Sequence, residues 1–243
     1  MDKSDEFLNQ YKILEEELYQ KYNFDDKTFG SPVVRFINDK EGRQFKDRLN
    51  LCREIRNLLS HHSEFEGEPI IEPSLAMINF LKEVTDYVRR PPLALDFATL
   101  YDNIMKTNLS QKAQVVMRKM ERLGFSHIPV ISEGEFIGVF SVSTVFTYII
   151  KNNMTSLNDD MTIEDFSELL PIERHSSEKF MFVGKDATLF EVKQAFENKT
   201  QRNKRLSAIF ITDNGSKGGR ILGMLTPWDI LGKDLSNLTI RNI

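Results

Sequence analysis

One stretch of sequence occurs twice in the second half of the chain. Residues 221–231, ILGMLTPWDIL, match residues 136–146, FIGVFSVSTVF, position by position, and upstream of them residues 206–214 align with residues 126–134. An internal repeat of this kind indicates a structural unit that is used twice. Each copy reads as helix, strand, short turn, strand and helix. This order predicts two α/β units whose apolar strands are covered on both faces.

The second copy places a hydroxyl and a carboxylate at the corner where its last strand runs into a helix. Thr226 and Asp229 lie three residues apart there, a spacing at which the two groups could hold a ribose diol. Gly223, just upstream, lets a neighbouring backbone or a ligand come close. The same residues also read as a helix start, with Thr226 as N-cap, Pro227 in the first turn and Asp229 reaching back as in a capping box. The two roles can coexist.

The repeat resembles a tandem pair of CBS domains. The residues that carry the resemblance are 124–130 and 137–141 in the first copy, and 186–189, 205–213 and 223–229 in the second. This resemblance implies a regulatory module whose two units pack sheet to sheet. It also implies clefts for adenosine-containing ligands such as AMP, ADP, ATP or S-adenosylmethionine, and association of the modules into flat dimers.

The resemblance assigns the ribose contacts to Thr226 and Asp229. In the first copy Ser141 keeps the hydroxyl, but Thr144 stands where the carboxylate should be. A neutral hydroxyl is a weaker acceptor than an ionised carboxylate for two ribose hydroxyls. We therefore expect one good site and one that is poor or empty.

Further candidates for ligand contacts lie beside the strands that face the clefts. His127 and Arg205, together with Lys204, are candidates for phosphate contacts, although surface or packing roles would also explain them. Ser207 and Ala208 stand in the second copy where His127 and Ile128 stand in the first. We include both as candidate ligand-binding residues.

The first part of the chain is helical in character and ends at Pro91-Pro92, which stop a helix firmly. We therefore expect a helical domain at 1–90, the first unit at 91–150, a linker at 151–177 and the second unit at 178–243. In the helix expected from about residue 43 to 61, one apolar stripe follows the helical period; it consists of Phe45, Leu49, Cys52, Ile55 and Leu59. Arg56 falls inside this stripe, so its guanidinium must reach solvent or find a partner.

The end of this helix resembles the motif of HEPN domains, which are small helical bundles. Arg56, Asn57 and His61 fit the family pattern of an Arg, a polar residue and a His near a helix end. The resemblance implies a metal-independent ribonuclease acting on RNA as a dimer, with His61 as acid or base, Arg56 stabilising charge on phosphorus and Asn57 orienting groups. Some HEPN-like domains are non-catalytic, and Arg56 could instead be a structural ion-pair residue. The acidic residues around this region do not favour RNA.

The composition excludes several other classes of protein. A net charge of −4 and a pI near 5.7 argue against a general nucleic-acid coat protein. A single cysteine fits a reducing compartment, and no window suggests a secretory signal or a membrane span, so we expect a cytoplasmic protein. His61-His62 lack a third ligand at metal-binding spacing, so no metal is predicted. The sequence thus predicts an α+β protein, a helical bundle followed by a CBS pair, that senses an adenosine-containing ligand; the alternative is a ribonuclease controlled by that pair.

Overall fold

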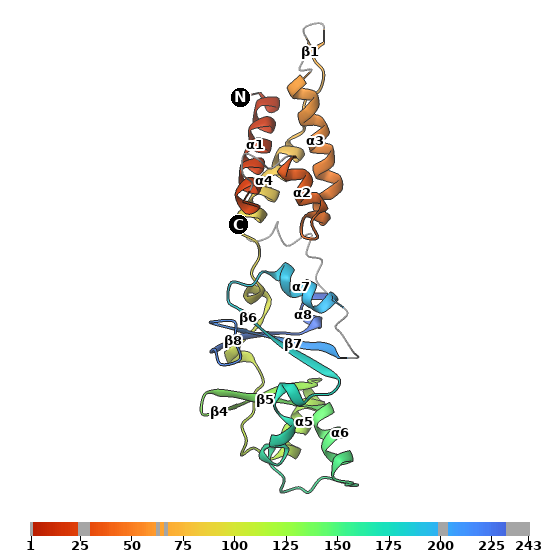
Figure 1. The fold of residues 1–243 in the computed structure, drawn as a ribbon, viewed down its shortest axis with the longest axis vertical. Helices are drawn as coiled ribbons and strands as arrows, with labels where there is room; N and C mark the ends of the chain where they lie inside the picture. Colours follow the sequence, from red (N-terminus) through yellow and green to blue (C-terminus); the bar gives the residue numbers. More distant parts are fainter. Residues whose placement is uncertain (1, 24–29, 62–63, 66–67, 199–203, 232–243) are drawn as a thin grey trace. The chain divides into compact units, whose positions relative to one another are not determined.

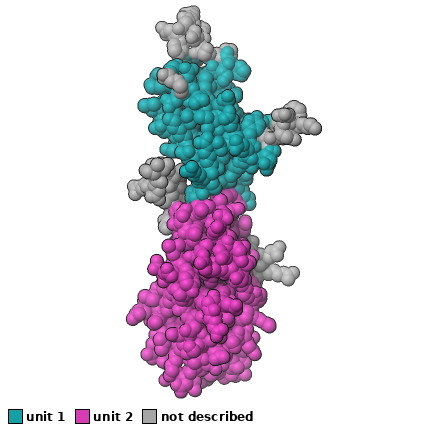
Figure 2. All heavy atoms as spheres, turned by 90° about the vertical axis from the view of Figure 1, so that its left-hand side faces the viewer, with its two compact units in different colours: residues 1–92, 234–243 teal, residues 93–233 magenta. Residues whose placement is uncertain are grey.

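The computed structural model describes residues 2–23, 30–61, 64–65, 68–198 and 204–231 (Figure 1). The chain divides into two compact units, one containing the described residues up to Pro92 and the other containing those from Leu93 onward (Figure 2). Within the described ranges, no helix is both long and apolar enough to span a membrane.

The first unit is built from helices. Its elements are α1 (Lys3–Lys21), α2 (Pro32–Asn38), the 3₁₀ helix η1 (Gly42–Phe45), α3 (Lys46–His61), the two-residue strands β1 (Glu64–Phe65) and β2 (Glu68–Pro69), and α4 (Leu75–Arg89). Ser31 is the N-cap residue of α2, with Pro32 in the first turn. Among the described residues, its buried hydroxyl oxygen has neither a capping hydrogen bond nor another hydrogen-bond partner.

The core of the first unit follows the helical period of the sequence. The apolar stripe predicted for α3 is confirmed, since Leu49, Cys52, Ile55 and Leu59 are buried and Phe45 packs against them half-buried. The same cluster includes one face of α1, with Phe7, Tyr11, Leu14 and Leu18, and one face of α4, with Ile78, Leu81 and Val84. Burial raises the pKa of the Cys52 thiol to about 11, so Cys52 acts as an apolar core residue.

The second unit contains both repeats. The first repeat has α5 (Ala113–Leu123), β4 (His127–Ser132), β5 (Glu135–Ser141) and α6 (Val142–Lys151), preceded by η2 (Ala94–Phe97), β3 (Thr99–Leu100) and η3 (Tyr101–Asn103). After η4 (Ile163–Leu169) and η5 (Ile172–Arg174), the second repeat has β6 (Glu178–Gly184), α7 (Leu189–Glu197), β7 (Arg205–Thr212), β8 (Ile221–Leu225) and α8 (Pro227–Leu231). The residues expected as a linker join the fold, because Ile163, Phe166 and Leu170 are buried in the core of the first repeat.

In the described part of the second unit, the strands form two sheets of unequal size. The larger sheet has the order β3-β8-β7-β6, with β6 and β7 parallel and the other pairs antiparallel, and β4 pairs with β5 in the smaller one. β3 precedes the first repeat but pairs with β8 of the second, with Leu100 opposite Gly223. Between β3 and α5, Thr107 forms an isolated parallel bridge with Val130 of β4.

The two sheets pack face to face over an aromatic core. Phe210 of β7 is buried, and its ring centroid lies 5.0 Å from that of Phe136 in β5 and 5.4 Å from that of Phe182 in β6. α5 and α6 cover the outer side of the smaller sheet, and α7 and α8 cover the larger one (Figure 1). A helical unit followed by two packed repeats confirms the predicted α+β class.

Candidate ligand-binding clefts of the repeat pair

The corner between β8 and α8 brings Thr226 and Asp229 together. The Thr226 backbone N–H donates to Asp229 Oδ2 at 2.7 Å, and the Thr226 hydroxyl donates to the same oxygen at 2.8 Å. Asp229 therefore caps its helix in the way that the capping interpretation predicts. Both bonds end on Oδ2, so Oδ1 takes no part in the cap. The hydroxyl and the carboxylate are held side by side without using all of their acceptor positions.

Each strand-helix corner is preceded by a glycine against which another part of the unit packs. A Cβ added at Gly223 would meet Ala98, the Thr99 carbonyl oxygen and Leu95, and one added at Gly138 would collide with the Leu170 carbonyl group. The close approach expected at Gly223 is therefore made by the chain itself. The segment that leads into the first repeat lies against β8 of the second, and the segment that leads into the second repeat lies against β5 of the first. Each corner is thus flanked by the segment that leads into the other repeat.

The corner of the first repeat forms a complete capping box. The Ser141 hydroxyl accepts from the Thr144 backbone N–H at 3.1 Å, and the Ser141 backbone N–H donates to the Thr144 hydroxyl at 3.2 Å. Both residues are buried. Thr144, which replaces the carboxylate of the second copy, is therefore committed to starting α6.

A carboxylate reaches this first corner from elsewhere in the chain. Glu178, the first residue of β6, accepts the Ser141 hydroxyl at 2.8 Å on Oε2. His175 Nδ1 lies 2.8 Å from the same oxygen, and His127 Nε2 lies 3.0 Å from Oε1. The side chains of Glu178 and His175 are 14% and 1% exposed. The structure thus joins two predicted site residues, Ser141 and His127, through a carboxylate that the sequence analysis did not single out.

The electrostatics of this cluster hold Glu178 in its charged form. Burial, the largest single effect, raises the pKa of the carboxyl, but hydrogen bonds from His127, His175 and Ser141 together outweigh it. The net result is a pKa lowered from the usual 4.5 to about 2. A carboxylate that accepts several hydrogen bonds is stabilised in its ionised form. Glu178 is therefore an anion at any physiological pH.

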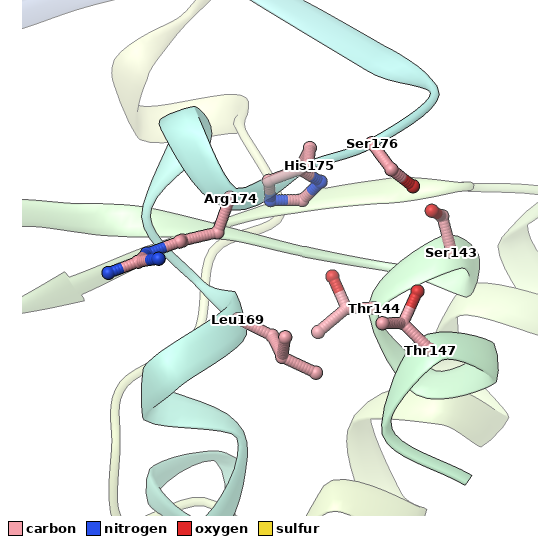
Figure 3. Close-up of a pocket in the computed structure, with 7 residues that line it drawn as sticks. All are labelled: Ser143, Thr144, Thr147, Leu169, Arg174, His175 and Ser176. Atoms are coloured by element: carbon pink, nitrogen blue, oxygen red, sulfur yellow. The ribbon is translucent and has the colours of Figure 1, made fainter. Parts of the chain in front are cut away.

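A small hollow opens beside the cluster. Ser143, Thr144 and Thr147 of α6 line one side, and Leu169, Arg174, His175 and Ser176 line the other (Figure 3). In Figure 3 the Ser143 and Ser176 hydroxyls point toward one another, whereas the guanidinium of Arg174 points away from them. The hollow has a volume of about 10 Å³.

The remaining candidates lie along β7. Arg205 is exposed at the start of the strand, and its Cα is paired with that of Glu178. The Ser207 hydroxyl donates to the Arg205 carbonyl oxygen at 3.3 Å, and Ala208 is fully buried between the two sheets. Lys204 Nζ donates to the His175 carbonyl oxygen at 2.6 Å. Ala208 therefore contributes to packing, and Lys204 helps to fix the backbone next to His175.

Glu178 and His175 were missed because nothing in their local sequence marks them as a pair with the first repeat. One signal was available. Thr144 occupies the position of a carboxylate, and Glu178 is an acidic residue immediately before the apolar strand at 180–183. A missing acidic group in one copy could have prompted a search for an acidic residue in the segment that leads into the other.

In the first unit, the structure gives Arg56 a partner. Its Nη2 lies 3.6 Å from Glu15 Oε2, its Nη1 donates to Asn57 Oδ1 at 3.3 Å, and its guanidinium lies 5.7 Å from the centre of the Tyr11 ring. Burial raises the pKa of Glu15, and the charge of Arg56 opposes this. His61 is exposed at the last residue of α3, and His62 lies outside the described residues. These contacts of Arg56 are those of a structural ion pair.

Among the described residues, no group of three or more His, Cys, Asp and Glu side chains has an arrangement that could hold a metal ion. His127 Nε2 and His175 Nδ1 lie at hydrogen-bonding distance from the Glu178 carboxylate.

Comparison with known proteins gives matches of two kinds. A search for similar solved structures found CbpB in complex with c-di-AMP, with 19% sequence identity over 66% of this chain and 94% of that chain and a TM-score of 0.47. It also found CBSX2 in complex with AMP, with 16% identity over 62% and 99% of the two chains and a TM-score of 0.41. No curated protein matches the chain. The model of the CBS domain matches residues 84–151 and 172–236, which together make up more than half of the sequence. The chain therefore belongs to the CBS domain family.

Proposed function

We propose that this protein is a regulatory sensor that binds an adenosine-containing ligand at the Thr226/Asp229 corner of its second repeat. The ligand class is the one that membership in the CBS family suggests: AMP, ADP, ATP or S-adenosylmethionine. Occupancy of this cleft is passed to the helical N-terminal domain. A ligand can act in this way only if it binds one arrangement of the chain more tightly than another.

This proposal rests on the hydrogen-bond acceptors that stay available at the second corner. Asp229 uses Oδ2 for its cap, and this leaves Oδ1 and the Thr226 oxygen able to accept hydrogen bonds from a ribose diol. The cap also fixes both groups before a ligand arrives, which lowers the entropic cost of binding. The capping role and the binding role are therefore compatible.

Calorimetric titration of the full chain with each of the four ligands tests the proposal. We expect at least one ligand to bind, and Asp229→Asn to weaken its binding by about tenfold or more, because a hydrogen bond to a charged group contributes about 1.5–3 kcal/mol. Asparagine keeps the oxygen that caps α8, so this variant separates binding from folding. Asp213→Asn, in the β7–β8 turn, is the matched control and should bind like the wild type. If none of the four ligands binds, the proposal is wrong.

We also propose that the protein forms a homodimer through α5 and α6. An apolar hollow of about 450 Å³ lies between these helices; its lining residues include Met117, Met120, Phe125, Val142, Phe146 and Ile149. Val142 and Phe146 are 62% and 66% exposed. Contiguous exposed apolar surface of this kind marks interaction sites. A second copy of the chain is the partner that the CBS resemblance suggests.

The dimer proposal predicts a large effect of one charged substitution. Phe146→Glu places a charge in the centre of the apolar surface and should raise the dimer dissociation constant at least about tenfold. Sedimentation-velocity ultracentrifugation over a range of concentrations measures this shift. Gln111→Glu adds the same charge at an exposed polar residue outside the hollow and should leave the distribution unchanged. A wild-type chain that sediments as a monomer at every concentration would rule the dimer out.

Ribonuclease activity of the N-terminal domain stays a hypothesis. The exposure of His61 is compatible with it, because the imidazole is accessible at the end of α3. The ion pair of Arg56 with Glu15 favours the structural interpretation of Arg56. We therefore rank sensing above RNA cleavage.

A further inference from the structure

At each strand-helix corner a hydroxyl group donates a hydrogen bond to a carboxylate, but the two carboxylates come from different places in the chain. In the second repeat, the Thr226 hydroxyl donates to Asp229 at 2.8 Å, three residues further along the chain. In the first repeat, the Ser141 hydroxyl donates to Glu178, also at 2.8 Å and 37 residues away. The carboxylate that Thr144 fails to provide is supplied by the start of β6.

Three of the roughly four acceptor positions of the Glu178 carboxylate face groups of the protein. Its Oε2 accepts from Ser141 and faces His175 Nδ1, and its Oε1 faces His127 Nε2. Ser141 and Thr144 are themselves bonded to each other through the capping box. The polar groups that would meet a ribose in the first cleft are thus occupied by other groups of the protein.

The volume of the hollow at this corner also argues against a bound nucleoside. The hollow between α6 and the segment around His175 has a volume of about 10 Å³, which is roughly the room needed by one water molecule. Pockets for drug-sized ligands measure about 300–1,000 Å³. A nucleoside does not fit in a hollow of this size.

We propose that Glu178 is an internal ligand of the first cleft, which is therefore a joint between the two repeats and not a second binding site. His127 and Ser141 belong to the first repeat, whereas His175 lies in the segment that leads into the second repeat and Glu178 begins β6 of that repeat. The carboxylate holds these elements together. Because the polar groups of the first corner are engaged in this joint, we place the ligand proposed above at the second repeat.

A double-mutant cycle tests the joint independently of any ligand. Glu178→Gln keeps the shape of the side chain but removes its charge, and it should lower the thermal unfolding midpoint of the full chain by about 5 °C or more, given the strength of hydrogen bonds to charged groups. Ser141→Ala should then cost clearly less in the Glu178→Gln background than in the wild type, because only its capping role remains. Glu173→Gln, at an exposed carboxylate in η5, is the control and should change the midpoint by less than about 1 °C.

Two results would contradict the proposal that Glu178 joins the two repeats. One is that the effects of Ser141→Ala and Glu178→Gln on the unfolding midpoint are additive. The other is that Glu178→Gln is as stable as the Glu173→Gln control. Should Glu178→Gln fail to fold, the cycle is run with Glu178→Asp, which keeps the charge but is one methylene too short to reach all three donors.

The stoichiometry of binding tests the second half of the inference, which rests on the proposed function. Equilibrium dialysis of the wild type against AMP, ADP, ATP or S-adenosylmethionine should give one ligand per chain at saturation, and Asp229→Asn should lower the affinity of this one site about tenfold or more. A second equivalent that persists in Asp229→Asn and disappears in Ser141→Ala would show an open first cleft and overturn the inference. If no ligand binds, the sensor proposal fails, whereas the double-mutant cycle still decides whether Glu178 forms the joint.

Discussion

Replacing Phe210 by alanine should lower the free energy of unfolding of the second unit by about 3–5 kcal/mol, the range observed when a large buried aromatic side chain is removed. Phe210 is 1% exposed on β7, a central strand of the larger sheet. Its ring lies among those of Phe136, Phe182 and Phe180, at centroid distances of 5.0, 5.4 and 6.4 Å. Phe136 comes from the first repeat and the other two come from the second. Removing Phe210 therefore leaves a cavity in the layer that joins the two repeats.

Urea unfolding followed by far-ultraviolet circular dichroism measures this loss. Phe210→Leu fills most of the space and should cost clearly less than Phe210→Ala. Leu123→Ala is the surface control, because Leu123 is 50% exposed at the end of α5, and its effect should stay within about 0.5 kcal/mol. A Phe210→Ala effect no larger than that of Leu123→Ala would mean that the sheets are not packed as described.

We expect the second large effect on stability when the pH is lowered. Because the pKa of Glu178 falls from 4.5 to about 2 on folding, its ionised form stabilises the folded state. This contribution is fully present above pH 4.5 and is lost as the pH falls from 4.5 toward 2. A shift of this size corresponds to about 3 kcal/mol, since one pKa unit is equivalent to about 1.4 kcal/mol. The Glu178 side chain is only 14% exposed, so solvent screens it little.

Comparing the pH dependence of two proteins isolates this contribution from that of the other carboxylates. The wild type and Glu178→Gln are unfolded with urea at pH 6 and at pH 3. Between pH 6 and pH 3, the free energy of unfolding should fall further for the wild type than for Glu178→Gln. The two proteins should therefore differ less in stability at pH 3 than at pH 6. Parallel pH profiles would contradict the assigned pKa. Glu173 also has a lowered pKa, but its side chain is 63% exposed in its ion pair with Lys217, so Glu173→Gln serves as the control.

Much of the local structure could be predicted from the sequence, because the signals lie within a few residues of one another. The buried stripe of α3 follows from helical periodicity, and the start of α2 at Pro32 follows from the Ser-Pro pair. The repeat predicted two similar units and identified their corners. At the second corner the sequence left capping and ribose binding open as compatible roles; the structure contains the cap, and ribose binding stays a prediction.

The partners of charged and polar groups were decided only by the tertiary structure. Glu178 meets Ser141 and His127 across 37 and 51 residues of sequence, and Arg56 of α3 meets Glu15 of α1. Such pairs depend on how sheets and helices pack, and a register change of one residue would turn a strand's side chain to the opposite face. The pairing of β3 with β8 of the second repeat also depends on packing. The sequence by itself determined that a unit is used twice and where its corners lie. Only the packing of one repeat on the other decided that the first corner is filled by a carboxylate from the segment leading into the second.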